Sequence, residues 1–154
     1  MVTRSTIEEL PPGSDAPRAT CTRRVALLVV ASAAAGCAGG QAVPRVASQG
    51  GRVVLPFTTH PTLASPGGTA VVSADDTRIF VMRSSDGGAT ARSMRCTHQG
   101  CIVSWDAGAS ELQCPCHGSR FSADGQVLAG PAEDPLPAYE ASVDGDSVVV
   151  RLEG

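Results

Sequence analysis

The stretch that most limits what this chain can fold into is CTHQGCIVSWDAGASELQCPCHGS, residues 96–119. It holds four of the chain's six cysteines and two of its three histidines. Each half pairs a cysteine with a histidine, as Cys96-x-His98 and as Cys114-x-x-His117. Thiolates and imidazoles together are donors for zinc and for iron–sulfur clusters. Both halves also contain the glycine or proline residues that tight loops need. The pattern therefore predicts a metal centre held between two loops.

Three interpretations of this stretch are open from the residues themselves. Two disulfides in an exported protein would use four cysteines but leave both histidines unexplained. A structural zinc site of the Cys2His2 type usually has its two cysteines together and its two histidines together, whereas each half here supplies one of each. A [2Fe–2S] centre with two cysteines on one iron and two histidines on the other accounts for all these residue types.

CTHQGC and CPCHGS resemble the two cluster-binding loops of the Rieske iron–sulfur protein family, and the resemblance extends over about residues 51–154. It implies one [2Fe–2S] cluster per subunit. In that arrangement Cys96 and Cys114 bind one iron, and His98 and His117 bind the other. The resemblance also implies an all-β fold, a small antiparallel sandwich or barrel that carries a two-loop cluster-binding subdomain.

Further family features fall on positions around the second loop. The resemblance implies a disulfide between Cys101 and Cys116, which suits an oxidising compartment. It implies that the Ser119 hydroxyl donates a hydrogen bond to a cluster sulfide. High-potential members of the family carry a tyrosine where this chain has Phe121, so we expect a lower midpoint potential than theirs. GPA, residues 130–132, resembles the family's proline loop, which covers the cluster.

The first 37 residues predict an export signal. A polar segment with four arginines precedes an apolar run over residues 25–36, which ends at Cys37. Twelve helical residues rise about 18 Å, and a bilayer core is roughly 30 Å thick, so the run suits a signal peptide. TRRVALL, residues 22–28, resembles a twin-arginine signal. AAGC, residues 34–37, resembles a bacterial lipobox and implies that Cys37 is lipidated; an uncleaved anchor or ordinary cleavage nearby are the alternatives.

A flexible tether is expected over residues 38–50, which are small and polar and contain glycine, serine and proline. The domain that follows, residues 51–154, contains short β-branched or alternating runs separated by turn residues, and no sustained helical period. The sequence DGD at residues 144–146 predicts a hairpin turn. Strands are expected at residues 52–57, 69–73, 78–83, 139–143 and 147–152.

These features predict one-electron transfer by a carrier tethered to the extracytoplasmic face of a bacterial membrane. Its partners would be redox proteins or a quinol-linked donor and acceptor, and an electron-transfer protein or oxidoreductase subunit is expected rather than a stand-alone enzyme. The formal net charge is −3 and the second half has no basic run, which argues against nucleic-acid binding.

Three other functions also use a centre of this kind. The chain could be the iron–sulfur subunit of a quinol-oxidising cytochrome bc-type complex, or the small subunit of an exported oxidase such as arsenite oxidase. Against the former stand the short apolar run and Gln99, at a position where such proteins usually have leucine. A ring-hydroxylating oxygenase is excluded because it needs two further histidines for a mononuclear iron, and only His60 remains.

Overall fold

A computed structural model describes residues 42–152 of the chain. The expected export signal at 1–37, its twin-arginine motif and the lipidated Cys37 lie outside the described residues. One short 3-10 helix, η1 (Pro61–Ala64), accompanies the strands. The strands are β1 (Ser48–Gln49), β2 (Arg52–Pro56), β3 (Thr69–Ala74), β4 (Thr77–Arg83), β5 (Ala89–Ser93), β6 (Ser104–Asp106), β7 (Glu111–Gln113), β8 (Arg120–Ser122), β9 (Val127–Ala129), β10 (Ala138–Asp144) and β11 (Ser147–Arg151).

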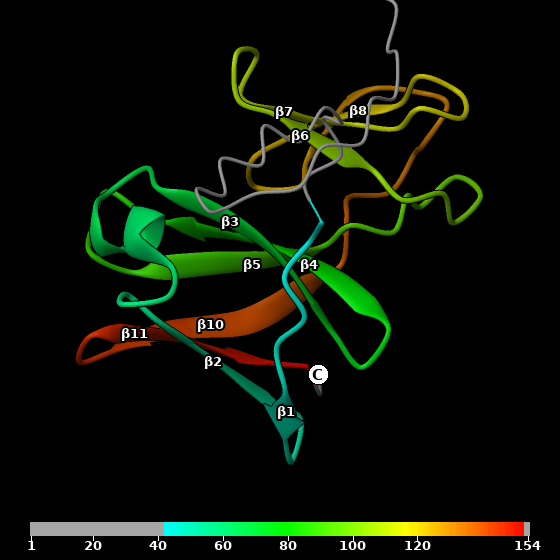
Figure 1. Cartoon of the computed structure of the whole chain (residues 1–154). Helices are drawn as coiled ribbons and strands as arrows, with labels where there is room; N and C mark the ends of the chain where they lie inside the picture. The colour runs from blue at the N-terminus through cyan, green and yellow to red at the C-terminus, as the bar shows by residue number, and fades with distance from the viewer. Residues whose placement is uncertain (1–41, 153–154) are drawn as a thin grey trace, which may run out of the picture. The chain divides into compact units, whose positions relative to one another are not determined.

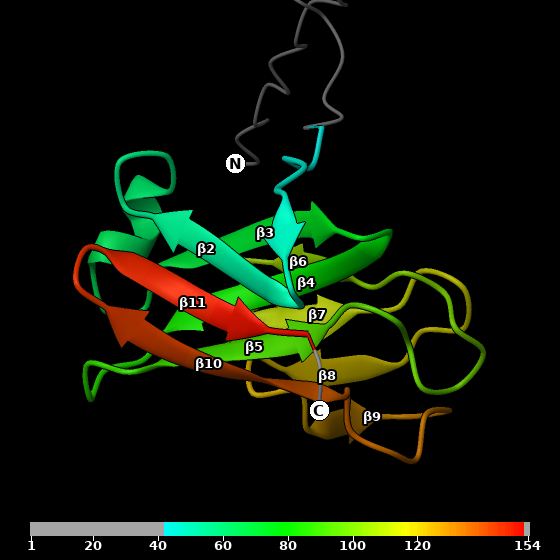
Figure 2. The ribbon, with the colours of Figure 1, turned by 90° about the horizontal axis from the view of Figure 1, so that it is seen from below.

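The strands form two antiparallel sheets, which confirms the all-β prediction. A seven-stranded sheet has the order β1-β2-β11-β10-β5-β4-β3, and it curls around a core (Figure 1). A four-stranded sheet has the order β6-β7-β8-β9 and lies at one side of the larger sheet (Figure 2). The small sheet is an insertion between β5 and β10, which are themselves neighbours in the large sheet. The chain therefore leaves the large sheet after β5 and returns to it at β10; the large sheet is called the base from here on.

Two hairpins of the large sheet have the tight turns that their residues favour. Asp75 and Asp76 join β3 to β4 with φ angles of 47° and 61°, the left-handed region that aspartate tolerates better than most residues. Gly145, with φ of 53°, begins the turn between β10 and β11. The hairpin predicted around residues 144–146 is therefore confirmed.

Alternating side chains build the core of the base. Val53 and Leu55 on β2 and Val148 and Val150 on β11 are fully buried, because every second residue of a strand faces the same side. A second core lies under the small sheet and includes Phe80 from β4. One strand of the base thus contributes to both cores and fixes the small sheet to it.

The residues that precede β2 lie along the base. The backbone N–H of Val46 donates to Ser73 O at 2.9 Å, and Ser73 N–H donates to Pro44 O at 2.9 Å, while β1 pairs with β2. This segment belongs to the stretch in which we expected a flexible tether. Over residues 42–152, the structure has no helix that is both long and apolar enough to cross a membrane.

Candidate metal centre

Three connections meet at the small sheet and form the candidate site. The first loop (residues 94–103) joins β5 to β6, and the second loop (residues 114–119) joins β7 to β8. The proline loop (residues 130–137) joins β9 to β10 and contains a cis peptide bond between Gly130 and Pro131. The four expected ligands lie on the first and second loops.

The first and second loops have the same backbone hydrogen bonds. In the first loop, Cys96 N–H donates to Cys101 O at 2.7 Å and Gly100 N–H donates to Cys96 O at 2.8 Å. In the second loop, Cys114 N–H donates to Ser119 O at 2.8 Å, and the N–H of the glycine at 118 donates to Cys114 O at 3.0 Å. Both loops therefore curl around a cysteine at their start.

A glycine is required at the same place in each loop. Gly100 has φ of 74° and Gly118 has φ of 79°, which residues with a side chain adopt only under strain. Because each glycine N–H closes the turn around the loop's first cysteine, these positions explain the glycine that follows each histidine motif in the sequence.

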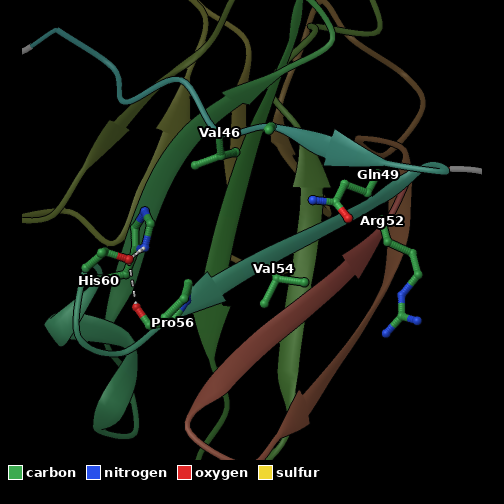
Figure 3. Close-up of a pocket in the computed structure, with 8 residues that line it drawn as sticks. Val46, Gln49, Arg52, Val54, Pro56 and His60 are labelled. Atoms are coloured by element: carbon green, nitrogen blue, oxygen red, sulfur yellow. Dashed lines mark hydrogen bonds between the residues drawn. The ribbon is translucent and has the colours of Figure 1, made fainter.

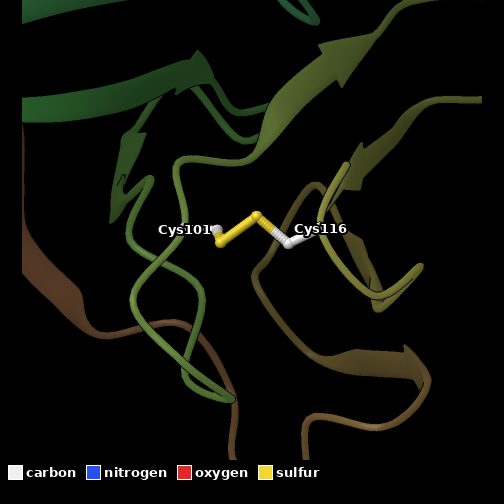
Figure 4. The surroundings of a disulfide bond; sticks show 2 residues. All are labelled: Cys101 and Cys116. Atoms are coloured by element: carbon white, nitrogen blue, oxygen red, sulfur yellow. A yellow bond between two sulfur atoms is a disulfide. The ribbon is translucent and has the colours of Figure 1, made fainter.

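A disulfide joins Cys101 on the first loop to Cys116 on the second (Figure 4). This pairing is the one that the sequence analysis expected, and the structure confirms it. The Cα atoms of the two residues are 6.5 Å apart. The bond holds the two loops side by side and leaves Cys96 and Cys114 as free thiols, both buried.

The two free thiols and the two histidines have the chemistry of a mixed thiolate and imidazole site. Cys96 and Cys114 are 2% and 3% exposed, whereas His117 is exposed and His98 is half-buried. The two imidazole rings lie edge to face, with centroids 4.8 Å apart and planes at 90°. The Nδ1 atom of His98 is buried and has no hydrogen-bond partner among the described residues. A buried nitrogen without a partner is costly, and an iron ion would satisfy it. The residues present therefore fit a [2Fe–2S] cluster with two thiolate and two imidazole ligands.

If only the distances between sulfur atoms were considered, a different set of three cysteines would be chosen as metal ligands. The Sγ atoms of Cys101, Cys114 and Cys116 lie within 4.8 Å of one another. Two of these sulfurs form the disulfide and have no thiolate to offer a metal. Their closeness shows instead that the disulfide lies against the buried thiol of Cys114.

Two side chains tie the proline loop to the other loops. The Ser119 Oγ atom, which is fully buried, accepts a hydrogen bond of 3.0 Å from Ala132 N–H. The Thr97 hydroxyl, between the first loop's cysteine and histidine, donates to Asp134 O at 2.7 Å. Ser119 and residues 130–132 were predicted from the sequence, whereas Thr97 was not. Its position between two expected ligands was the available signal.

A hydrophobic core supports the site from below. Phe121, Leu112 and Val103 are buried in the same cluster of side chains as Cys96 and Cys114. Phe80 and Trp105 pack with their ring centroids 4.5 Å apart, which connects the base to the small sheet. The loops are therefore supported by a buried hydrophobic core, while His117 and Gln99 are exposed at the surface.

The third histidine, His60, is not part of this centre. Its Nδ1 atom is 3.0 Å from the Thr59 hydroxyl at the start of η1. It lines a groove of about 520 Å³ on the base, together with Val54 on β2 and Val46 (Figure 3).

Comparison with known proteins agrees with this geometry. The family profile described as Rieske [2Fe-2S] domain matches residues 57–140. The cytochrome b6-f complex iron-sulfur subunit of Chlorobaculum tepidum is 33% identical over 102 residues, which are 66% of this chain and 56% of that protein. The subunit of the same name from Gloeobacter violaceus is 51% identical over 55 residues, 36% of this chain and 30% of that one. The chain therefore matches about half of the first relative and less of the second.

Solved structures give the same picture of the fold. The cyanobacterial plasma membrane Rieske protein from Synechocystis PCC 6803 is 35% identical, with a TM-score of 0.50, over 55% of this chain and 86% of that chain. A naphthalene 1,2-dioxygenase structure is 20% identical with a TM-score of 0.53, over 67% of this chain and 26% of that one, and it shows likeness of fold alone.

Proposed function

Because the chain belongs to the Rieske [2Fe-2S] domain family, we propose that its domain passes single electrons between two redox partners. The cofactor of this family is a [2Fe–2S] cluster with mixed cysteine and histidine ligation. When bound, such a cluster takes up and releases one electron at about −150 to +300 mV. The observation that carries the proposal is the combination of two buried free thiols with two imidazoles in edge-to-face contact.

The proposed ligand set is Cys96 and Cys114 on one iron, with His98 and His117 on the other. The thiols belong to the buried hydrophobic cluster under the loops. The imidazoles lie nearer the surface, with their ring centroids 4.8 Å apart. His117 is exposed, so its ring is the edge through which a partner comes closest to the centre. The fold keeps the two thiols buried away from water and leaves the His117 ring accessible to a redox partner.

Ser119 has the proposed task of directing a proton toward the centre. Its oxygen is engaged as an acceptor by Ala132 N–H. The hydroxyl proton is therefore left to donate to a sulfur acceptor, which would stabilise the more negative, reduced form. Phe121, two residues later on β8, has no proton to donate, so the site lacks a second donor of this kind.

The proposed setting is the extracytoplasmic face of a bacterial membrane. Residues 1–37 support this setting as a twin-arginine-like signal whose end resembles a lipobox, and Cys37 is the proposed lipidation site. The Cys101–Cys116 disulfide supports it from the folded domain, because such bonds persist in oxidising compartments. Twin-arginine transport of an already folded domain would also suit a protein that must acquire its cluster before export.

Membership in a quinol-oxidising complex is the second candidate. It is favoured by two relatives that are named as cytochrome b6-f complex iron-sulfur subunits. Gln99, Phe121 and the short apolar run at residues 25–36 favour the separate carrier. The two functions differ in the redox partners with which the domain exchanges electrons.

Electron paramagnetic resonance of the purified protein tests the proposal. We expect a rhombic signal with an average g value below that of the free electron after reduction. His117→Ala should abolish the signal, and His60→Ala, the matched control, should leave it unchanged. A signal after ascorbate alone would favour quinol oxidation; a signal only after dithionite would favour the separate carrier. Retention of the signal in the His117 variant would contradict the ligand assignment.

A further inference from the structure

The residue before the first ligand, Arg95, has its side chain laid across the first loop. A Cβ atom placed on Gly100 would be 3.0 Å from Arg95 Nε and 3.2 Å from Nη2. Gly100 is also the residue whose N–H closes the turn around Cys96. The guanidinium therefore lies directly against the backbone that encloses a proposed ligand, and the absence of a side chain at Gly100 makes room for it.

Within residues 42–152, no carboxylate forms an ion pair with Arg95. The ion pairs in the described part of the chain are Arg120 with Glu111 and Arg151 with Glu140. The acidic residues of the proline loop are Glu133 and Asp134, and both are exposed. Neither carboxylate pairs with Arg95, although the Asp134 carbonyl accepts the Thr97 hydroxyl. Within the described part of the chain, the positive charge of Arg95 at the first loop is therefore unpaired.

Arg95 faces the same concavity as the proposed ligands of its loop. A hollow of about 410 Å³ is lined by Arg95, Cys96, His98 and Gln99, among others. Arg95 thus precedes the proposed ligand Cys96 directly in the chain and lines the same hollow as His98. Interaction between charges that are neighbours at a protein surface is appreciable, and salt weakens it.

We propose that Arg95 is a tuning residue, whose fixed positive charge raises the midpoint potential of the centre. An added electron makes the centre more negative, and a nearby cation stabilises that state more than the oxidised one. The effect opposes the absence of a hydroxyl donor at Phe121. Because Arg95 is exposed, the effect should depend on ionic strength. The inference rests on the proposed ligand set, and it adds a residue that touches neither iron nor sulfur.

Redox titration of the cluster-loaded full-length protein, followed by visible circular dichroism, tests this role. The variants are Arg95→Gln, Arg95→Met and Arg95→Lys. The matched control is Arg52→Gln, which removes the same charge from β2, beside the groove of Figure 3. Each protein is measured at low and at high salt. Methionine keeps an unbranched side chain but has no guanidinium over Gly100, and glutamine keeps a polar end without the charge, so the two neutral variants separate charge from packing.

We expect both neutral variants to lower electron affinity by about three- to tenfold at low salt, with a smaller difference at high salt. Arg95→Lys should stay near the wild-type potential, and Arg52→Gln should not differ from it. A purely structural role would lower thermal stability without moving the potential.

Two results overturn the inference while leaving the proposed function intact. One is a loaded cluster whose potential is the same in wild type and in both neutral variants. The other is an equal shift in Arg52→Gln, which would show an effect of net charge alone. A wild-type protein that holds no reducible cluster would instead overturn the proposed function, and with it this role for Arg95.

Discussion

The hydroxyl oxygen of Ser119 accepts a hydrogen bond of 3.0 Å from the backbone N–H of Ala132. The bond joins the second loop to the proline loop at a position where both residues are buried. Since the oxygen is an acceptor here, the hydroxyl proton is available to the centre. One side chain therefore ties the proline loop to the second loop, and its hydroxyl proton would be free to donate to the proposed centre.

Ser119→Ala should lower the midpoint potential by roughly 60 mV or more. A hydrogen bond to a charged acceptor contributes about 1.5–3 kcal/mol, and a tenfold change in electron affinity corresponds to about 59 mV for one electron. Redox titration measures the shift. Ser122→Ala is the matched control, because it removes a hydroxyl that lies on β8, three residues after Ser119 in the chain, and accepts a hydrogen bond from Gln126 N–H. An unchanged potential in the Ser119 variant would refute its role as a donor.

Cys101→Ser should give a protein whose cluster assembles but is lost sooner. Cross-linking residues 15 apart in sequence stabilises a fold by about 3 kcal/mol in the loop-entropy description, and here it also holds the two ligand loops together. The half-life of the visible absorption at raised temperature measures the loss. The double variant Cys101→Ser/Cys116→Ser removes the leftover thiol and should be equally labile. Wild-type half-lives in both variants would show that the bond does not protect the site.

Thr97→Val should loosen the proline loop, because it removes the hydroxyl that donates to Asp134 O. A hydrogen bond of this kind contributes about 1 kcal/mol. It links the first loop to the proline loop, and it comes from a residue that lies between two proposed ligands in the chain. Amide hydrogen exchange over residues 130–137 should become faster. Thr97→Ser keeps the hydroxyl and should exchange as the wild type does. Equal exchange in the valine and serine variants would mean that the tie is dispensable.

The strands that were predictable from the sequence are those with long alternating or β-branched runs. Residues 52–57, 69–73 and 78–83 coincide closely with β2, β3 and β4. The small sheet was not predictable strand by strand, because β6–β9 have three residues each. Runs of that length have no measurable period, and pairing with neighbours decides their conformation.

The candidate site was more predictable than the strands around it. Cysteine, histidine and glycine at fixed spacing carry chemistry that does not depend on the exact strand boundaries. The ties by Thr97 and the placement of Arg95 over Gly100 could not be predicted, since both depend on how side chains cross between loops. A tether was predicted over residues 38–50; in the described part of that stretch, Pro44 and Val46 share backbone hydrogen bonds with Ser73 of β3, and β1 pairs with β2, which composition alone does not indicate.

Phe121→Tyr should raise the midpoint potential. Phe121 is fully buried on β8, in the same core as Cys96 and Cys114. A tyrosine there would bring a phenol hydroxyl close to the proposed ligand sulfurs, and a hydrogen bond to thiolate sulfur favours the reduced state. Redox titration should show a rise of about 60 mV if the bond changes electron affinity tenfold.

Phe57→Tyr provides the control, because Phe57 packs against the core of the base rather than that of the small sheet. Its hydroxyl should leave the potential unchanged. A rise in the Phe121 variant alone would show that the hydroxyl reaches a sulfur of the centre, and that the phenylalanine keeps the native potential low. If Phe121→Tyr keeps its cluster and the native potential, the phenol does not reach a ligand, and the low potential expected here must have another cause.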